Sequence, residues 1–166
     1  MRLRKICSGG QTGADQEGLR QAKRRGLATG GWCPKGWKTE KGSEPWLAEF
    51  GLVEHPSFDY KPRTWANVRD SDVTVWFGNT DSPGYICTKN GCKHHNKPFY
   101  ENPTAEQMLV LAMAFECINV AGNRISKNPW VAGQVKLAFG LILSHHDHTY
   151  DENGELDCCA GKVKDL

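Results

Sequence analysis

The sequence predicts an α/β fold, a three-layer sandwich in which helices cover both faces of a central, mostly parallel five-stranded sheet. Three observations predict it. Short apolar segments alternate with helix-like segments along the chain, and this alternation favours parallel strands joined by right-handed crossovers. Residues 73–77, VTVWF, are rich in the β-branched and aromatic residues typical of strands. A glycine-rich stretch follows the first expected strand and opens the first expected helix.

The first elements follow from apolar periodicity and from glycine. Residues 3–7 form a short apolar strand, and residues 14–25 have the spacing of an amphipathic helix that ends at Gly26. A second short strand is expected at 27–31. The apolar positions that face inward from this region are Leu19, Ala22 and Leu27.

The middle of the chain is broken by polar residues, glycine and proline. Residues 32–45 are expected to form a loop, and residues 45–51 one or two helical turns. A helix at 64–72 then leads into 73–77, the clearest strand of the chain, and residues 78–84 form a loop.

The last third of the domain continues the alternation. Thr104 and Gln107 have the spacing of a capping box, which marks the start of a helix. Gly91 weakens the helical pattern that contains it. The expected elements are a helix at 85–96, a strand at 97–102, a helix at 104–116, a strand at 117–122 and a helix at 128–143.

Length and charge narrow the class of protein. A chain of 166 residues can form one domain with a real core, and we expect that domain at residues 1–143, followed by a polar tail at 144–166. The formal net charge of +2 argues against binding of nucleic acid polymers. No apolar run approaches the roughly 18 residues of a membrane span, so no membrane partner is expected.

The chain start and the cysteines indicate the compartment. MRLRKIC lacks the apolar stretch of a secretory signal. The seven cysteines are odd in number and scattered, unlike a secreted disulfide framework. We therefore expect reduced thiols in a cytoplasmic protein, and we also expect a homo-oligomer.

The stretch CSGGQTGADQEG, residues 7–18, is the first candidate site. It joins a strand to a helix at the carboxyl edge of a parallel sheet, where ligands bind in such folds. Its glycines allow close approach of the backbone, and a helix N-terminus favours an anion such as phosphate. The alternative is a tight turn with Asp15 as a capping residue. The candidate residues are Ser8, Gly9, Gly10, Gln11, Thr12, Gly13 and Asp15.

A second loop, GNTDSPG at residues 78–84, repeats this arrangement after another strand. Asp81, Ser82 and Gly84 are its candidate ligand-binding residues, and the alternative is a plain strand-to-helix connection. Two anion-binding loops on adjacent strands would indicate a ligand larger than a single phosphate, similar to a nucleotide.

Segments in a fixed order resemble the circularly permuted YpsA-type SLOG domains, also described as molybdenum carriers. They are ICSGGQTGAD, TGGWCPKG, RTWANVRDSD, DSPG, and NVAG with SK shortly after, between about residue 5 and residue 143. The resemblance implies a Rossmann-like fold that binds a nucleotide-derived or pterin-phosphate ligand. Some members are linked to molybdenum cofactor, and the wider group includes sensors of ADP-ribose-type signals and cytokinin-releasing phosphoribohydrolases. Tyr85 stands where members tend to have Thr, and the tail with HHDH and CC has no counterpart.

The loop GGWCPKGWK can cover such a site. Lys35 and Lys38 can pair with phosphate, while Trp32 and Trp37 offer flat faces for a purine or pterin ring. The alternative is that one tryptophan packs in the core with Cys33 buried beside it.

The segment RTWANVRDSD adds Arg63 and Asn67 as candidate ligand-binding residues. Arg63 is expected to precede the helix and to reach the ligand, because arginine suits two-point contact with phosphate. The alternative is a solvent-exposed helix laced with salt bridges. Asp72 is expected to cap the helix or to accept backbone hydrogen bonds.

Metal sites are weakly indicated. Cys87, Cys92 and the His94–His95 pair lack the paired spacing of a zinc site. The tail contains His145, His146, His148, Cys158 and Cys159, and we expect it to be solvated rather than metal-bound. No metal site and no required cofactor are therefore expected.

The sequence favours binding over catalysis. The phosphoribohydrolase relatives use a P-G-G-x-G-T-x-x-E loop, and this chain has no carboxylate at the corresponding place in SPGYICTKN. We expect a protein that carries, senses or sequesters a phosphate-containing nucleotide-derived molecule, or a pterin such as molybdenum cofactor as cargo. The alternative is a nucleotide hydrolase or nucleosidase, for which Asp15 and Asp81 are the candidate carboxylates.

Overall fold

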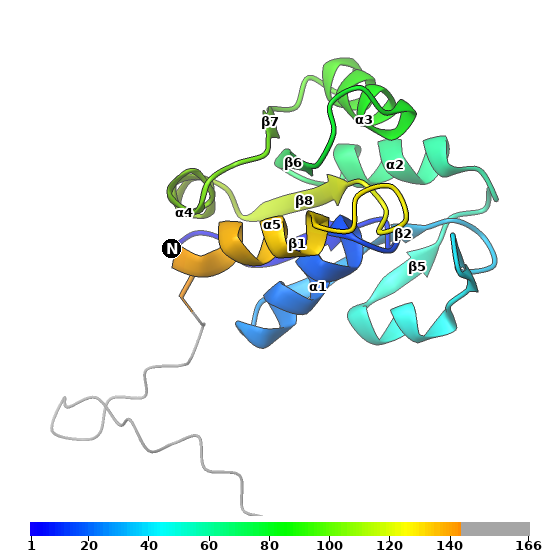
Figure 1. The fold of residues 1–166 in the computed structure, drawn as a ribbon, viewed down its shortest axis with the longest axis horizontal. Helices are drawn as coiled ribbons and strands as arrows, with labels where there is room; N and C mark the ends of the chain where they lie inside the picture. Colours follow the sequence, from blue (N-terminus) through cyan, green and yellow to red (C-terminus); the bar gives the residue numbers. More distant parts are fainter. Residues whose placement is uncertain (144–166) are drawn as a thin grey trace, which may run out of the picture.

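The computed structural model describes residues 1–143, and a six-stranded parallel sheet forms its centre (Figure 1). The strands lie in the order β5-β2-β1-β8-β6-β7, and every neighbouring pair is parallel. Their bounds are β1 Lys5–Ser8, β2 Ala28–Cys33, β5 Leu52–Glu54, β6 Val73–Phe77, β7 Phe99–Glu101 and β8 Cys117–Gly122. A small antiparallel hairpin, β3 Lys38–Thr39 with β4 Gly42–Ser43, stands apart from this sheet.

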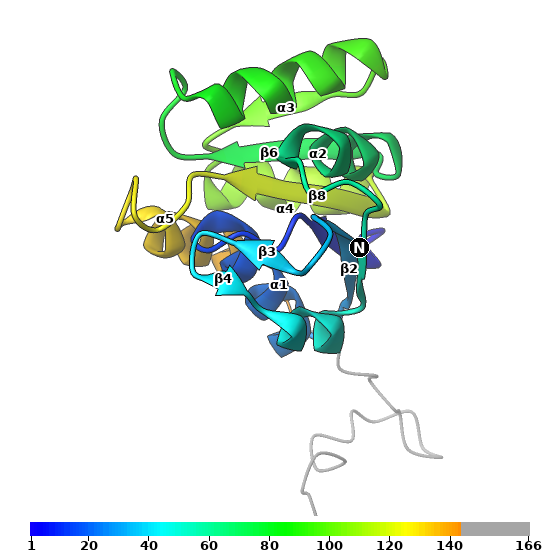
Figure 2. The ribbon, with the colours of Figure 1, turned by 90° about the vertical axis from the view of Figure 1, so that its right-hand side faces the viewer.

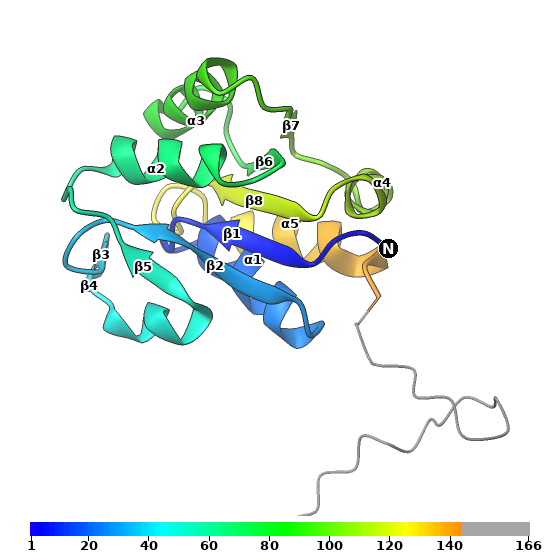
Figure 3. The ribbon, with the colours of Figure 1, turned by 180° about the vertical axis from the view of Figure 1, so that it is seen from behind.

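Helices cover both faces of the sheet, as the sequence predicts (Figures 1 and 3). One face carries α1 Ala14–Arg24, α4 Ala105–Ala114 and α5 Val131–Ala138, which is extended by the 3-10 turn η2 Phe139–Leu141. The opposite face carries α2 Tyr60–Arg69 and α3 Pro83–His94, which pack on each other. Figure 2 shows the hairpin beside the carboxyl edge, next to the connection that follows β1. The Rossmann-like, three-layer α/β prediction is confirmed.

The predicted number of five strands is wrong, because Leu52–Glu54 adds a sixth strand at the edge. This strand has three residues, of which only Leu52 is buried, so it carries no alternating pattern. It is held by backbone pairing with residues 31–33 of β2. The segment before it is the 3-10 helix η1, Pro45–Phe50.

The bounds of two helices also differ from those that the sequence predicts. Helix α2 begins at Tyr60, so Arg63 lies inside the helix rather than before it. The closing helix is shorter than expected and ends in the 3-10 turn η2. The capping box of Thr104 and Gln107 is confirmed at the start of α4. The expected tail at 144–166, with its histidines and paired cysteines, lies outside the described residues.

The two faces of the sheet differ in chemistry. On one side, Ile6, Val75 and Val120 belong to a large apolar core shared with α1, α4 and α5. On the other side, beneath α2 and α3, the alternate strand positions include the polar residues Thr74 and Asn119, and the Asn119 amide donates to the Thr74 hydroxyl at 3.2 Å. An apolar core fills one interlayer space, while the other contains buried side chains that can form hydrogen bonds.

Within residues 1–143, none of the helices is both long enough and apolar enough to cross a membrane.

Candidate functional site

A cavity of about 620 Å³ lies between the α2–α3 layer and the carboxyl ends of β1, β6 and β8. The strand order reverses at this place. Strands β2 and β5 lie on one side of β1, and β6 and β7 lie on the other side. Strand β8, the last in the chain, lies between β1 and β6. Ligands bind at such a switch point in open parallel sheets. The lining residues include Gly9, Gln11, Asp15, Tyr60, Lys61, Arg63, Asn67, Trp76, Asn79, Ser82, Gly84, Asn119, Asn123, Arg124 and Lys127.

The loop after β1 is held by its own side chains. The Gln11 N–H donates to the Asp15 carboxylate at 3.2 Å, and the Thr12 N–H donates to the Gln11 side-chain oxygen at 3.0 Å. The N–H of Ala14 is bound by the carbonyl of Asn123 at 3.2 Å. Several backbone donors of the expected anion cradle therefore have partners within the protein.

The glycines of this loop are required by packing. Gly10 and Gly13 have φ values of 75° and 85°, which favour glycine. A Cβ at Gly10 would lie 2.7 Å from a Leu52 methyl carbon, and one at Gly13 would lie 2.4 Å from the Asn123 carbonyl oxygen. Neither residue lines the cavity. Of the three glycines, Gly9 is the one that faces it.

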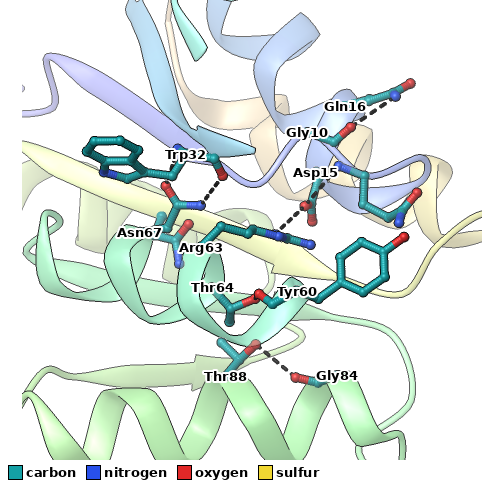
Figure 4. Close-up of polar contacts among 12 residues, drawn as sticks. Gly10, Asp15, Gln16, Trp32, Tyr60, Arg63, Thr64, Asn67, Gly84 and Thr88 are labelled. Atoms are coloured by element: carbon teal, nitrogen blue, oxygen red, sulfur yellow. Dashed lines mark hydrogen bonds and ion pairs between the residues drawn. The ribbon is translucent and has the colours of Figure 1, made fainter. Parts of the chain in front are cut away.

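Asp15 is a buried carboxylate in the cavity wall. Burial raises its pKa, while Arg63 and the Gln11 and Gly9 amides act in the opposite direction. Arg63 Nη1 lies 3.4 Å from Asp15 Oδ2, and both side chains are largely shielded from solvent (Figure 4). This pair joins α2 to the first turn of α1.

Cations from three segments converge on the ring of Tyr60. Lys38 of the hairpin lies 5.0 Å from the ring centroid, Arg63 of α2 5.6 Å, and Arg124 of the loop after β8 5.5 Å. Lys61 and Lys127 also line the cavity. Figure 4 shows Tyr60 beside the Arg63 side chain. Asp15 is the only carboxylate among the lining residues of the described chain, so the cavity is strongly positive.

Two side chains that line the cavity contain buried polar atoms without a hydrogen-bond partner. Gln11 Nε2 and Arg63 Nε form no hydrogen bond within the described protein. Buried donors are normally paired, so each unpaired donor that lines a cavity indicates a place for an acceptor.

The loop after β6 has a structural framework of its own. Ser82 caps α3 by accepting from the Tyr85 N–H at 3.2 Å, and Asn123 Nδ2 donates to the same hydroxyl at 3.3 Å. The Asn79 N–H is bound by Asn123 Oδ1 at 2.6 Å. Ser82 and Gly84 line the cavity. Tyr85 packs instead against Trp76, with their ring centroids 5.6 Å apart.

The structure brings half of the predicted site residues together. Seven line the cavity, namely Gly9, Gln11, Asp15, Arg63, Asn67, Ser82 and Gly84. The other seven lie elsewhere, namely Ser8, Gly10, Thr12, Gly13, Trp32, Lys35 and Asp81.

Several of those outlying residues have identified contacts. The Trp32 indole donates to Asp70, the C-cap residue of α2, at 2.8 Å, and Lys35 lies 5.1 Å from the Phe58 ring centroid. The Thr12 hydroxyl donates to the Glu40 carboxylate. Burial acts to raise the pKa of Glu40, but hydrogen bonds from Ser126 and Thr12 bring it below its usual value.

The sequence interpretation missed the residues that complete the cavity. They include Tyr60, Lys61, Trp76, Asn79, Asn119, Asn123, Arg124 and Lys127. The sequence contained a signal for Asn123, Arg124 and Lys127. They lie in the loop after residues 117–122, which follows a parallel strand and so reaches the same edge as the two glycine-rich loops. Tyr60 carried no such signal, since it lies in the turn of α2 that the sequence did not indicate as helical.

The remaining expectations concern structure and metals. Asp72 accepts from the Glu116 and Cys117 N–H groups at 3.0 and 2.8 Å, so its backbone-binding role is confirmed. Arg69 pairs with Asp70 at 2.6 Å on the exposed end of α2. Within residues 1–143, no three His, Cys, Asp or Glu side chains gather closely enough to hold a metal ion.

Two comparisons relate the chain to known proteins. Residues 6–143 match the model of the circularly permutated YpsA SLOG family. The crystal structure of a "Putative molybdenum carrier protein" from Syntrophus aciditrophicus superposes with a TM-score of 0.74 at 31% sequence identity, covering 86% of this chain and 96% of that one. A search of curated proteins gave no match. The chain belongs to the circularly permuted YpsA SLOG family.

Proposed function

We propose that this family member binds a small phosphate-bearing molecule in the cavity at the sheet edge, and that it carries, senses or sequesters this molecule without turning it over. The ligand is nucleotide-derived or a pterin cofactor, and molybdenum cofactor as cargo is one form of the proposal.

The observation that carries the proposal is the cluster of cations on Tyr60. Lys38, Arg63 and Arg124 come from three separate segments and all lie within 5.6 Å of one ring centroid. Arg63 is paired with Asp15, but Lys38 and Arg124 take part in none of the salt bridges of the described residues, so the group favours an additional anion. The unpaired donors of Gln11 and Arg63 support the same placement, because phosphate oxygens are strong acceptors.

The rest of the cavity suits a heterocycle. Its volume of about 620 Å³ lies within the range of small-molecule sites. Asn67, Asn119 and Asn123 supply amides that can both donate and accept, and Trp76 contributes an aromatic wall. Such a wall with convergent amides supports a ligand that has a ring besides its phosphate. The name of the similar Syntrophus protein supports molybdenum cofactor as one candidate.

The alternative function, a nucleotide hydrolase or nucleosidase, is favoured by Asp15. A cavity-lining carboxylate whose pKa is raised by burial is a candidate general acid or base. Its ion pair with Arg63 and its bond to the Gln11 amide favour a positioning role instead. Asp81 does not line the cavity, which leaves Asp15 as the carboxylate to test.

The experiment has two parts. The purified protein is denatured, and released small molecules are identified by mass spectrometry. The protein is then incubated with an excess of AMP, NAD or ADP-ribose, and products are followed by chromatography. A binder releases intact ligand and depletes about one equivalent per site. Many equivalents of product, lost in Asp15→Asn, would instead establish the hydrolase.

We also propose a cytoplasmic homo-oligomer. Val110 and Met113 on α4 and Leu137 on α5 are more than half exposed, and these helices lie next to each other on one face. Exposed apolar side chains in one area support self-association. Light scattering after size-exclusion chromatography tests this, and a monomer at all concentrations contradicts it.

A further inference from the structure

Two cysteine sulfurs lie against each other on the face of the sheet opposite the large apolar core. Cys7 Sγ of β1 and Cys117 Sγ of β8 are 3.3 Å apart, close enough for one thiol to donate to the other. The two strands are parallel neighbours, and Cys7 pairs with Asn119, so Cys117 is its diagonal neighbour two residues earlier on β8. To form a disulfide, the sulfurs would have to approach by roughly 1.2 Å.

The two thiols are electrostatically unequal. The hydrogen bond from Cys117 lowers the pKa of Cys7, and Lys5 adds to this, against the effects of burial and of Asp70 and Asp72. The same contact raises the pKa of Cys117. The thiol that accepts the hydrogen bond ionises more readily and the donor keeps its proton, and the directions of the two pKa shifts correspond to Cys7 as the acceptor.

The other described cysteines lack this arrangement. Burial raises the pKa of Cys33 to about 11 and also raises the pKa values of Cys87 and Cys92. Cys7 itself is 3% exposed, and Cys117 is partly exposed beside it, so Cys117 is the more solvent-accessible member of the pair.

We propose that Cys7 and Cys117 form a peroxide-sensitive dithiol, in which oxidation joins the two sulfurs in an intrachain disulfide. The Cys7 thiolate attacks one oxygen of hydrogen peroxide, an S–O bond forms, the O–O bond breaks, and hydroxide leaves. The Cys117 sulfur then attacks the Cys7 sulfur, displaces the second hydroxide and gives up its proton. Two thiols and one peroxide thus become one disulfide and two waters.

The position of the pair connects this chemistry with the cavity. From Cys7, β1 continues directly into Gly9, and from Cys117, β8 continues into the lining residues 121–123. A disulfide here joins the two central strands whose ends carry the site. The proposal does not depend on the identity of the ligand.

Peptide mapping of the full chain tests the proposal. Reduced protein is treated with a small excess of hydrogen peroxide, alkylated and digested with trypsin. Cleavage after Lys5, Arg20, Lys93 and Arg124 gives peptides 6–20 and 94–124, each with a single cysteine. We expect these two peptides to appear as one linked species, lighter by two hydrogens than their sum. Cys7 should react about tenfold faster than Cys33, or more, because the thiolate is the reactive form.

Variants separate the pair from other thiols. Cys33→Ser should leave the linkage unchanged, and Cys7→Ser should abolish it. In Cys117→Ser, oxidation of Cys7 should stop at the sulfenic acid, which dimedone traps. The proposal is wrong if Cys33, Cys87 or Cys92 is oxidised first while Cys7 and Cys117 stay reduced and are recovered in alkylated form. A linkage of either peptide to a different cysteine also overturns it, and both outcomes are read from the wild-type chain.

Discussion

Replacing Arg124 with alanine is the most direct test of the anion site. Arg124 lines the cavity, and its guanidinium lies 5.5 Å from the Tyr60 ring centroid. Within the described residues it takes part in none of the salt bridges. Its removal should therefore change the free energy of unfolding by about 0.5 kcal/mol or less, as for most partly exposed side chains.

The expected loss of affinity follows from one charge-assisted hydrogen bond. Such a bond contributes about 1.5–3 kcal/mol, so the Kd should rise about 13- to 160-fold. Arg63 needs a milder change, because alanine would leave the buried Asp15 carboxylate without its cation. Arg63→Lys keeps the charge but loses the planar pair of donors, so its affinity should fall by less than that of Arg124→Ala.

Isothermal titration with ADP-ribose at low ionic strength measures both effects. Lys35→Ala is the matched control, because Lys35 lies over Phe58 and outside the cavity lining. Its Kd should stay within about twofold of the wild-type value, the effect of removing a screened surface charge. Wild-type affinity in Arg124→Ala and Arg63→Lys, combined with weak binding in Lys35→Ala, would refute the Tyr60 cluster as the anion site.

Four further variants, measured by urea unfolding, test the framework around the site. Gly13→Ala should lower the free energy of unfolding by more than about 2 kcal/mol, because its Cβ would lie 2.4 Å from a carbonyl oxygen at a φ of +85°. Gly42→Ala, at φ +102° with no atom within 4 Å of the new Cβ, should cost only about 1 kcal/mol, and equal losses would contradict the packing argument. Burial raises the pKa of Asp15 above its ordinary value of 3.8, so protonation of this carboxylate favours the folded state. The free energy of unfolding of the wild type, relative to that of Asp15→Asn, should therefore rise as the pH falls from 7 toward 4. A difference that does not change with pH would exclude this linkage. Thr104→Ala should cost about 0.5–2 kcal/mol by removing the capping box of α4, and unchanged stability would show that α4 is held by packing alone.

Local patterns predicted most of the fold. The strands expected at 73–77 and 117–122 are observed with those bounds, because apolar β-branched runs between turn residues are a local signal. The capping box of Thr104 is equally local, since its two hydrogen bonds join residues three apart. Leu52–Glu54 escaped prediction because its strand conformation depends on pairing with β2 and not on its own three residues.

The sequence predicted the position of the cavity, but only half of the predicted site residues line it. Gly9 and Ser82 follow parallel strands, and the carboxyl ends of such strands meet at one edge whatever the side chains are. Which side chains turn into the cavity was not predictable in the same way. Gly10 looked like a ligand-facing glycine, yet its neighbours are Leu47 and Leu52 of the segment after β4.

The sequence by itself determined the alternation of strands and helices and the edge at which the loops gather, because alternation, capping and turn chemistry act between residues a few positions apart. Only the tertiary structure decided that Lys38, Arg63 and Arg124 meet on Tyr60. These residues come from a hairpin, a helix and a loop that are brought together by strand register and by the ion pair of Arg63 with Asp15. The direction of each side chain is therefore set by packing between distant segments, which no local pattern encodes.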